Sequence, residues 1–320
     1  MKAYAFQNTS AREIGLEHGE VFRDSVRAMA SIRMDLVLGE PAFGSKEQVL
    51  DLATQHLPIL EAYDLDLYHE LLGIADGAGV TPEEIVVLNH YTDLRDIGGC
   101  TMVFVPSPTG NLLGQTWDID ASALPHTLLL QFKDALVLSV AGCLGLTGFN
   151  SQGVGICINN LSSLDARVGL VWPALVRRVL RARSAKEGSD LVMNAPLGSG
   201  HHYAVGDKSD FFGIETSGTR KKLVQHGTDK PHFHTNHCLD QEIAEVSTVR
   251  TGSTTYHRYN TTETGLSQQV PQDLKGLWKA LAAVSMEPGD NAVATCGAMA
   301  MNLTTGEWHA CQGPARAEDI

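Results

Sequence analysis

The chain changes character at Cys100, which follows the glycine pair Gly98-Gly99. Before this point, apolar residues recur at helical spacing behind the N-cap candidates Ser10, Ser45 and Thr81. After it, short apolar runs bounded by turn residues indicate strands. No stretch rich in Gly, Ser and Pro divides the chain. We therefore expect one α+β domain, residues 1–320, in which helices flank the sheets.

Periodicity and turn residues predict the individual elements. Residues 10–98 have the apolar spacing of helices. The expected helices are 10–32, 45–56, 57–78, 81–91, 172–185, 188–194 and 274–284. The expected strands are 101–105, 112–119, 127–132, 135–141, 148–150, 154–160, 202–206, 211–215, 222–226, 232–236, 298–303 and 307–311. Turn residues between neighbouring strands predict hairpins at 127–141 and 298–311.

The charge balance limits the partners of this chain. Its 320 residues include 24 basic and 37 acidic side chains, which gives a net charge of −13. Nucleic acids and anionic membrane surfaces favour basic patches. No apolar run approaches the roughly 18 residues of a membrane-spanning helix. We therefore expect neither nucleic acid nor a membrane as a partner.

The cysteines indicate a compartment. The six cysteines are widely spaced and none forms a CxxC pair, which is unlike a disulfide framework or a zinc ribbon. Free thiols in a reducing compartment are the simplest interpretation. The first residues, 1–7, lack the apolar stretch of a signal peptide. We therefore expect a cytoplasmic protein.

Cys100 has the features of a nucleophile that becomes a chain terminus. A free thiol has a pKa of about 8.5, and a free α-amino group has a pKa of about 7.7 to 8. If the chain cuts itself between Gly99 and Cys100, one residue carries both nucleophile and base. Gly99 has no Cβ and leaves its carbonyl open to the neighbouring thiol. The alternative is a turn followed by a buried structural cysteine.

Five stretches in the same order resemble one family. They are Ile14 to Glu20, Leu72 to Asn89, Gly99-Cys100-Thr101, Gly114-Gln115-Thr116-Trp117-Asp118 and His234-Thr235-Asn236-His237. Together they resemble the acyl-coenzyme A:6-aminopenicillanic acid acyltransferase family of cysteine N-terminal-nucleophile hydrolases. The resemblance spans nearly the whole chain and is weakest in residues 239–290.

The resemblance implies a fold and a precursor. The expected fold is a four-layer αββα sandwich of two stacked antiparallel sheets between helices. The chain is expected to be a zymogen that cleaves itself before Cys100. The helical segment 1–99 then stays bound to the segment 100–320, which begins with the nucleophile. We expect a small-molecule amide substrate, and association into homo-oligomers is left open.

The resemblance also assigns site residues. Cys100 is the expected nucleophile, and Gly99 and Cys100 form the cleavage site. Asp118 is expected beside the nucleophile, where a carboxylate can tune its proton balance. Asn236 is expected to donate its side-chain N–H₂ group to the oxyanion. The expected supporting residues are Thr101, Trp117, His234 and His237.

The same residues have plainer alternatives. Asp118 can be a surface or turn acid, and Asn236 can be a strand-end asparagine making a turn bond. The dense histidines His201-His202 and His232-x-His234-x-x-His237 could hold zinc, but no cysteine partner or HExxH motif accompanies them. We therefore expect no metal and no cofactor.

The expected activity is that of a cysteine amidohydrolase. Attack by Cys100 on a non-peptide C–N amide bond would give an acyl-enzyme that water hydrolyses. The same acyl-enzyme could pass its acyl group to an amine, which makes an acyltransferase the first alternative. A non-catalytic binding protein on the same fold is the second alternative.

Overall fold

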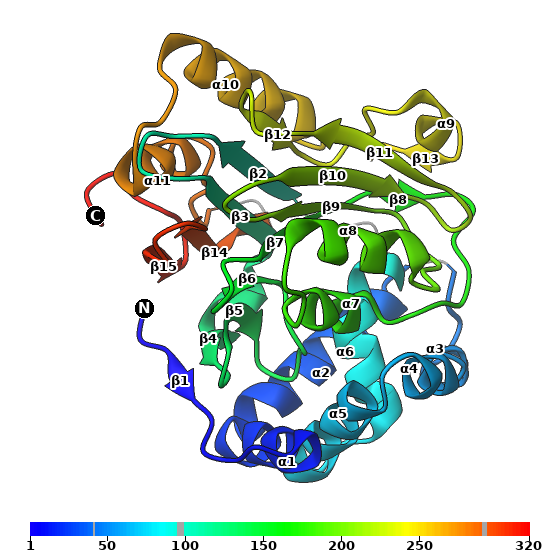
Figure 1. The fold of residues 1–320 in the computed structure, drawn as a ribbon. Helices are drawn as coiled ribbons and strands as arrows, with labels where there is room; N and C mark the ends of the chain where they lie inside the picture. The colour runs from blue at the N-terminus through cyan, green and yellow to red at the C-terminus, as the bar shows by residue number, and fades with distance from the viewer. Residues whose placement is uncertain (41, 95–98, 290–292) are drawn as a thin grey trace.

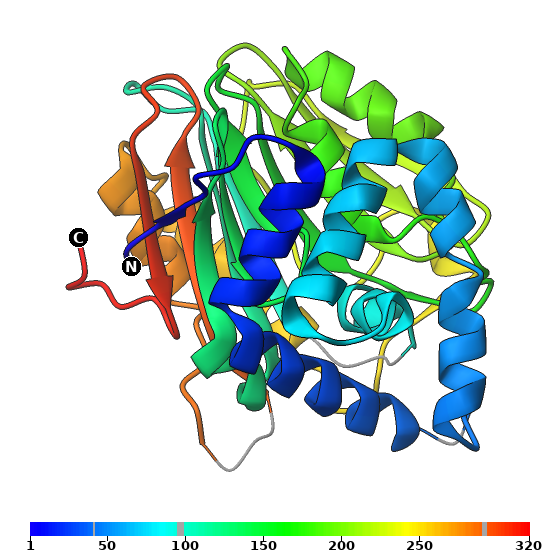
Figure 2. The same cartoon turned by 90° about the horizontal axis from the view of Figure 1, so that it is seen from below.

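Two β-sheets lie face to face between two layers of helices (Figure 1) in the computed structural model, which describes residues 1–40, 42–94, 99–289 and 293–320. Seen from below, the amino-terminal helices, coloured blue and cyan, cover one side of the sheets, and the orange helical region lies on the other side (Figure 2). The order of layers is helix, sheet, sheet, helix. The predicted four-layer αββα sandwich is therefore confirmed.

The larger sheet has the strand order β1-β4-β5-β6-β7-β9-β10-β11, and the smaller one has the order β12-β2-β3-β14-β15. Strands β8 and β13 form a separate pair. All described pairs are antiparallel except β1 with β4. The strands are β1 (Tyr4–Ala5), β2 (Gly99–Val105), β3 (Leu112–Asp120), β4 (Thr127–Gln131), β5 (Ala135–Val140), β6 (Thr147–Asn150), β7 (Gly155–Asn160), β8 (Ser162–Ser163), β9 (His201–Gly206), β10 (Phe211–Thr216), β11 (Lys221–His226), β12 (His232–His234), β13 (Ser247–Thr248), β14 (Val293–Asn302) and β15 (Trp308–Gln312).

The helical layer that packs on the larger sheet contains helices from before and after Cys100. They are α1 (Ala11–Val21), α2 (Arg23–Leu38), α3 (Lys46–Thr54), α4 (Leu57–Tyr63), α5 (Leu65–Ala78), α6 (Pro82–Leu94), α7 (Trp172–Val179) and α8 (Ala185–Asn194). The remaining helical elements are the 3₁₀ turn η1 (Ala121–His126), α9 (Gln241–Ala244), α10 (Thr255–Gln268) and α11 (Leu274–Ala282). The two hairpins predicted at 127–141 and 298–311 are confirmed.

Three predicted helices differ from the structure. The helix predicted over 57–78 is two helices, because Asp64 is extended and its side chain accepts from the Leu67 N–H, which caps α5. The helix predicted over 10–32 divides at Phe22. The helix predicted over 172–185 ends at Val179, and Ser184 caps the next one. Residues 95–98 of the predicted helical segment lie outside the described residues.

Glycines let α1 and α5 pack with their backbones in contact. A Cβ on Gly15 would lie 2.0 Å from the Glu70 carbonyl oxygen, and one on Gly19 would lie 2.4 Å from the Ile74 oxygen. In the other direction, Cβ atoms on Gly73 and Gly77 would lie 2.4 and 2.3 Å from backbone oxygens of α1. The glycines of both helices are four residues apart and so share one helical face. The close helix pair therefore depends on these glycines.

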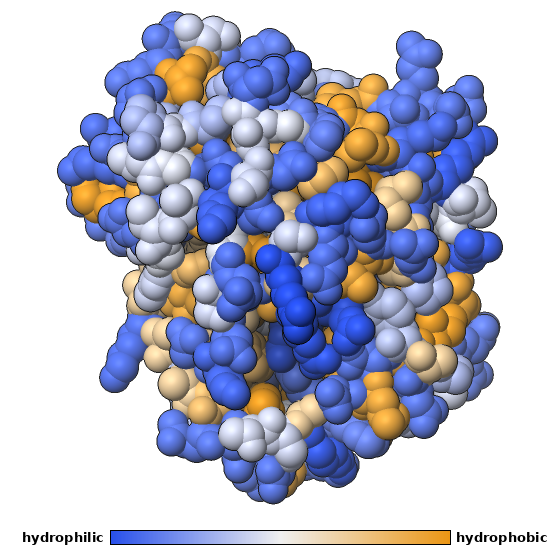
Figure 3. Space-filling model, viewed as in Figure 1, coloured by the Kyte–Doolittle hydropathy of each residue, from blue (hydrophilic) through white to orange (hydrophobic). Residues whose placement is uncertain are grey.

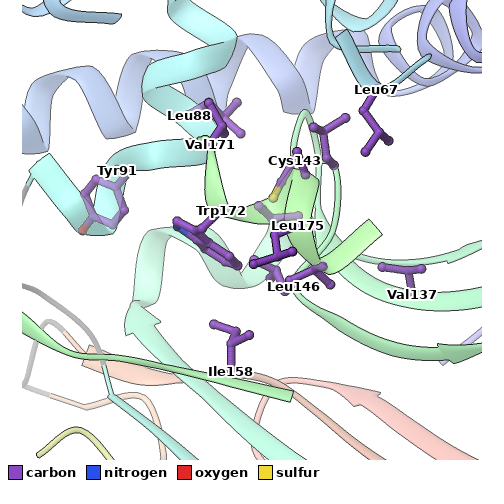
Figure 4. Close-up of a cluster of buried hydrophobic side chains, with 14 of the residues drawn as sticks. Leu67, Leu88, Tyr91, Val137, Cys143, Leu146, Ile158, Val171, Trp172 and Leu175 are labelled. Carbon is purple, nitrogen blue, oxygen red and sulfur yellow. The ribbon is translucent and has the colours of Figure 1, made fainter. Parts of the chain in front are cut away.

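Apolar side chains fill each of the three gaps between the layers. One cluster joins the first helical layer to the larger sheet, and it includes Trp172 and Leu175 of α7 and Ile158 of β7 (Figure 4). A second cluster lies between the sheets and includes Phe104 of β2 and Phe211 of β10, whose rings stack at 4.3 Å. A third packs α11 against the smaller sheet. The inner strands of both sheets are thus buried on both faces, while the edge strands β11 and β15 are partly exposed.

The viewed surface is mainly hydrophilic, and its hydrophobic residues are scattered in small areas (Figure 3). Such scatter is ordinary for a folded protein surface. In the ranges that the structure describes, no helix combines the length and apolar character that crossing a membrane requires.

Candidate active site

The β2–β3 hairpin brings Cys100 and Asp118 together. In its register Gly99 lies opposite Asp118, and Cys100 lies opposite Trp117. The two residues are 18 positions apart because the chain runs along β2, turns, and returns along β3 to the same end of the sheet. Cys100 is only 4 % exposed, and Asp118 is fully buried.

Asn236 reaches the same place from β12. That strand pairs with β2 through His234 and Met102, so the residues after His234 run toward Cys100. The Cys100 backbone N–H donates to Asn236 Oδ1 at 2.8 Å. Since this N–H can only donate, the contacting amide atom is the oxygen. Asn236 Nδ2 donates in turn to the Asn160 carbonyl at the end of β7, at 3.0 Å.

Arg258 of α10 is a buried site residue that the sequence interpretation missed. Its Nη2 donates to Asn236 Oδ1 at 2.8 Å, and its Nη1 donates to the Cys100 carbonyl at 2.5 Å and to Thr101 Oγ1 at 3.0 Å. It is 3 % exposed. A planar guanidinium has several N–H donors in fixed directions, so it can donate to these three oxygen atoms at once. One cation thus holds three residues of the candidate site in place.

Asp118 is held by two hydroxyl groups and by a long ion pair with Arg258. Its Oδ1 accepts from Thr295 Oγ1 of β14 at 2.6 Å, and its Oδ2 accepts from Thr116 Oγ1 at 3.4 Å. Arg258 Nε lies 3.9 Å from Oδ2. Burial raises the pKa of Asp118, and Arg258 and the two hydroxyls oppose that rise. The carboxyl is therefore a better proton acceptor than an ordinary aspartate.

The surroundings of Cys100 favour the protonated form of its thiol. Burial raises its pKa to about 12, and the charge of Asp118 adds to the rise. Arg258 and the backbone N–H groups of Asp118 and Asn160, which donate toward the sulfur, act in the opposite direction. A thiol with so high a pKa is a poor nucleophile at neutral pH unless a neighbouring base takes its proton.

A buried carboxylate fixes the segment that carries Asn236. Glu215 of β10 accepts from His234 Nε2 at 2.8 Å, from the Leu239 N–H at 2.6 Å and from the Asp240 N–H at 3.0 Å. Both Glu215 and His234 are fully buried. The contacts lie on both sides of Asn236, so Glu215 holds the two ends of the segment.

Thr255, at the start of α10, holds the middle of this segment. Its Oγ1 accepts from the Asn236 N–H at 2.8 Å and donates to Thr235 Oγ1 at 2.9 Å. His237 Nδ1 lies 3.0 Å from the same hydroxyl. Thr255 and Arg258 are three residues apart on one helix, so α10 supports Asn236 through its backbone and its side chain.

The four expected supporting residues have different surroundings. Thr101 accepts from Arg258, and Trp117 lies opposite Cys100 in the hairpin. His234 lies 2.8 Å from Glu215 through its Nε2 atom. His237 packs between the rings of Tyr256 and Tyr259 and lines a pocket beside Asn236.

The histidines considered for zinc are divided among separate places. His201 lies 3.6 Å from Asp93 of α6, while His202 stacks on His234 with ring centroids 3.8 Å apart. His232 Nε2 lies 3.0 Å from the Gly227 carbonyl. Across the described ranges, no three His, Cys, Asp or Glu side chains are grouped so that they could hold a metal ion.

Arg258, Thr255 and Glu215 could not be found from sequence patterns. Arg258 and Thr255 belong to α10, in the region 239–290 where no motif stands out, and α10 has an apolar stripe too weak to mark its buried face. Glu215 lies in a mostly apolar strand, where its acidic side chain is the main available signal.

Comparisons with known proteins point to one family. The model of the family described as acyl-coenzyme A:6-aminopenicillanic acid acyl-transferase matches residues 105–288. A protein of Emericella nidulans, described as the acyl-coenzyme A:6-aminopenicillanic-acid-acyltransferase 40 kDa form, is 27 % identical over an alignment of 241 residues; the alignment covers 71 % of this chain and 67 % of the relative.

Two solved structures are similar to parts of the fold. A mutant conjugated bile acid hydrolase from Clostridium perfringens aligns with a TM-score of 0.45 and 13 % identity over 67 % of this chain and 89 % of the other. A penicillin V acylase from Agrobacterium tumefaciens aligns with a TM-score of 0.42 and 12 % identity over 67 % and 82 %. From the family match, which covers more than half of its length, this chain is an enzyme that belongs to the acyl-coenzyme A:6-aminopenicillanic acid acyl-transferase family.

Proposed function

We propose that this enzyme is a self-processing cysteine amidohydrolase whose nucleophile is Cys100. The observation that carries the proposal is the bond from the Cys100 N–H to Asn236 Oδ1, with Arg258 on the same oxygen. After cleavage between Gly99 and Cys100, that nitrogen becomes a free α-amine. The amide oxygen then holds the amine beside the thiol, where it can serve as the base.

The cleavage step uses the groups at the hairpin. Asp118, with its raised pKa, accepts the thiol proton, and the sulfur attacks the Gly99 carbonyl carbon. The bond from that carbon to the Cys100 nitrogen breaks, the nitrogen takes up the proton, and a thioester remains. Water hydrolyses the thioester to a Gly99 carboxylate and a free thiol. The products are a 1–99 segment and a 100–320 segment.

The mature site then acts on an amide. The α-amine of Cys100 takes the thiol proton, and the sulfur attacks the substrate carbonyl. The second N–H of the Asn236 amide and the Asn160 N–H are the donors proposed for the oxyanion, and one such donor is typically worth about 10²–10³ in rate. The α-ammonium protonates the leaving amine. Water attacks the thioester and releases the acid.

Buried contacts support continued association of the two segments after cleavage. Glu70 of α5 pairs with Arg177 of α7 at 2.6 and 3.1 Å, with both side chains nearly buried. His18 Nε2 of α1 accepts from the Gly142 N–H at 3.0 Å. These bonds join the part before Gly99 to the part after it without the peptide bond.

Acyl transfer is the second candidate, and the family description and the named relative favour it. An amine that reaches the thioester before water would take the acyl group. The ratio of products in the presence of a competing amine separates the two activities, because a transferase gives mainly the new amide and a hydrolase gives mainly the acid.

The intact mass of the purified protein under denaturing conditions tests the proposal first. Cleavage predicts pieces of roughly 11 and 24 kDa when the 34.5 kDa chain is divided by length. Cys100→Ala should stay whole and inactive. Cys100→Ser keeps a weaker nucleophile and should cleave more slowly. An active Cys100→Ala protein would exclude this mechanism.

A further inference from the structure

His234 has an oxygen atom at each of its two ring nitrogens. Its Nδ1 lies 2.7 Å from the Thr235 carbonyl oxygen, and its Nε2 lies 2.8 Å from Glu215 Oε1. A neutral imidazole has one N–H to donate, whereas an imidazolium has two. With an ionised Glu215, both contacts are hydrogen bonds only if both ring nitrogens carry hydrogen. The two contacts therefore match an imidazolium ring at His234.

The other contacts of Glu215 match an ionised carboxylate. Its Oε1 also accepts from the Leu239 N–H at 2.6 Å, and its Oε2 accepts from the Asp240 N–H at 3.0 Å. A carboxylate only accepts, so its two oxygens can take three donors at once, and its charge strengthens each of these bonds. The side chains of Glu215 and His234 have no exposed surface, and buried charges require a partner. The proton therefore belongs on the ring, and the two residues form a buried ion pair.

The two histidine rings next to His234 are neutral. The His202 ring of β9 stacks on it with centroids 3.8 Å apart and planes 5° apart, and the His237 ring lies 6.4 Å away. Burial lowers the pKa of His202 well below its ordinary value and that of His237 to about 4, and the charge of His234 adds to both shifts. Two imidazolium rings stacked this closely would repel each other. A single charge among the three rings, on His234, is the arrangement consistent with these contacts.

The stacked ring of His202 is itself fixed to the larger sheet. Its Nδ1 lies 3.2 Å from Asn159 Oδ1 of β7, and the ring also forms a hydrogen bond with the Gln225 side chain of β11. Gln225 Nε2 donates in turn to the Phe233 carbonyl at 2.9 Å, one residue before His234. The larger sheet therefore supports the face of the His234 ring, while the two oxygen contacts hold its edge.

The bond to the Thr235 carbonyl orients the peptide that leads into Asn236. A peptide unit is planar, so the Thr235 C=O and the Asn236 N–H lie in one plane and point in opposite directions. His234 Nδ1 holds the C=O, and Thr255 Oγ1 accepts from the N–H at 2.8 Å. Both ends of this peptide unit are thus hydrogen-bonded. Its plane sets the direction in which the Asn236 side chain leaves the backbone toward Cys100.

Resting on the proposed function for its effect on turnover, we propose that His234 is a positioning residue that works as an imidazolium. Its second N–H holds the Thr235 carbonyl and so directs Asn236 at Cys100, while the Glu215 carboxylate balances its charge. A neutral ring at this place keeps the bond to Glu215 or the bond to Thr235, but not both.

Imidazole ¹H–¹⁵N NMR of the uncut Cys100→Ala form tests the charge without any turnover. An imidazolium has two protonated nitrogens with similar ¹⁵N shifts, whereas a neutral ring has one protonated and one bare nitrogen with very different shifts. The side-chain signals are assigned through the backbone of each histidine. At pH 7 we expect two similar shifts for His234 and two different shifts for His202. A bare nitrogen in the His234 ring would overturn the proposal.

His234→Gln tests the positioning role. The glutamine N–H₂ group can still donate to Glu215, but the side chain carries no charge and has no second donor for the Thr235 carbonyl. Both kcat and KM are measured on processed enzyme after the uncut fraction has been removed. We expect kcat to fall at least about tenfold, because a misdirected donor fails in the transition state, while KM stays within about twofold of its wild-type value.

His232→Gln is the matched control. His232 lies on the same strand, and its ring also stacks on an aromatic neighbour, Phe211, with centroids 4.9 Å apart. Among the described residues, its hydrogen-bond acceptor is the Gly227 carbonyl, 3.0 Å from Nε2, and a glutamine N–H₂ group can still donate there. This variant should keep kcat and KM within about twofold of wild type, because the peptide before Asn236 is untouched.

The two measurements separate this proposal from the catalytic one. A kcat in His234→Gln within about twofold of wild type, or an equal fall in both variants, would overturn the positioning role. If the wild-type enzyme cleaves no amide, the proposed hydrolase function fails, and the NMR spectrum still decides whether His234 is charged. If amides are cleaved but the His234 ring has a bare nitrogen, the function stands and this inference fails.

Discussion

The Arg258 guanidinium donates to the Cys100 carbonyl at 2.5 Å although the two residues are 158 positions apart in the chain. The same side chain also donates to Asn236 Oδ1. A helix from the far side of the smaller sheet thus holds the candidate nucleophile and the amide that accepts from its backbone N–H. The geometry of the site depends on how α10 packs against β2 and β12.

Arg258→Lys should therefore impair both cleavage and turnover. Lysine keeps the positive charge, but its single ammonium group lacks the fixed, spread N–H donors that reach Cys100, Thr101 and Asn236 together. We expect kcat to fall by about 10²-fold, similar to the loss of one oxyanion donor. Intact mass over time measures the cleavage, and steady-state kinetics on processed enzyme measures the turnover. Wild-type rates in this variant would show that a charge alone is enough.

Gly99→Ala should slow the cleavage step. A Cβ at this position would lie 3.0 Å from Arg258 Nη2 and 3.3 Å from Asp118 Cβ, so the arginine or the Gly99–Cys100 peptide must shift. We expect processing to slow at least about tenfold, which corresponds to about 1.4 kcal/mol of barrier. Gly265→Ala is the control, because a Cβ there meets nothing within 4 Å. Processing at the wild-type rate in Gly99→Ala would contradict the expected clash.

The sequence predicted those parts of the fold whose signals are local. Caps such as Ser10 and Ser45, hairpin turns and the Cys100–Asp118 spacing all act within one or two elements. The order of strands in each sheet depends on contacts between distant segments, and no local pattern encodes it. Arg258 and Glu215 became recognisable only when tertiary packing brought them to Asn236 and its neighbours. The break at Asp64 shows the same limit, because a capping side chain there interrupts an otherwise helical run.

Glu215→Gln should loosen the segment that carries Asn236. The carboxylate accepts from His234 and from the N–H groups of Leu239 and Asp240. A glutamine offers one oxygen, and its N–H₂ group would face a backbone donor. We expect kcat to fall more than KM rises, with a loss of about 1–3 kcal/mol in stability. Glu263→Gln, on the exposed face of α10, is the control. A stability loss with unchanged kcat would mean that Glu215 does not position Asn236.

Arg177→Met should weaken the buried contact between α5 and α7, which joins residues before Gly99 to residues after it. This change leaves Glu70 as a buried carboxylate without its cation, which typically costs about 3–5 kcal/mol. Urea unfolding of the uncut Cys100→Ala form measures the loss. The matched control, Lys186→Met, removes an exposed pair with Asp190 and should cost less than about 0.5 kcal/mol. The double change of Glu70 and Arg177 to Met should be less harmful than Arg177→Met alone, since no uncompensated charge remains.

His18 makes the link between the segments sensitive to acid. Its Nε2 accepts from the Gly142 N–H, which requires the neutral ring. Burial, and then the charge of Arg177, lower the pKa of His18 to about 3. Because the folded pKa lies below the unfolded value of about 6.5, the contribution is complete above pH 6.5 and is lost as pH falls toward 3. At pH 5 the loss is about 2 kcal/mol for this one group.

His18→Gln should therefore make the free energy of unfolding depend less on pH in the acid range. A glutamine oxygen can still accept from the Gly142 N–H, but it does not titrate. The measurement is the free energy of urea unfolding of the uncut Cys100→Ala form, with and without His18→Gln, at pH 7, 6 and 5. His56 and His201, whose pKa values burial lowers to about 4, titrate in both proteins and provide a common background. The variant should lose about 2 kcal/mol less between pH 7 and pH 5. Parallel curves would mean that the His18 ring is already protonated, or already free of Gly142, at neutral pH.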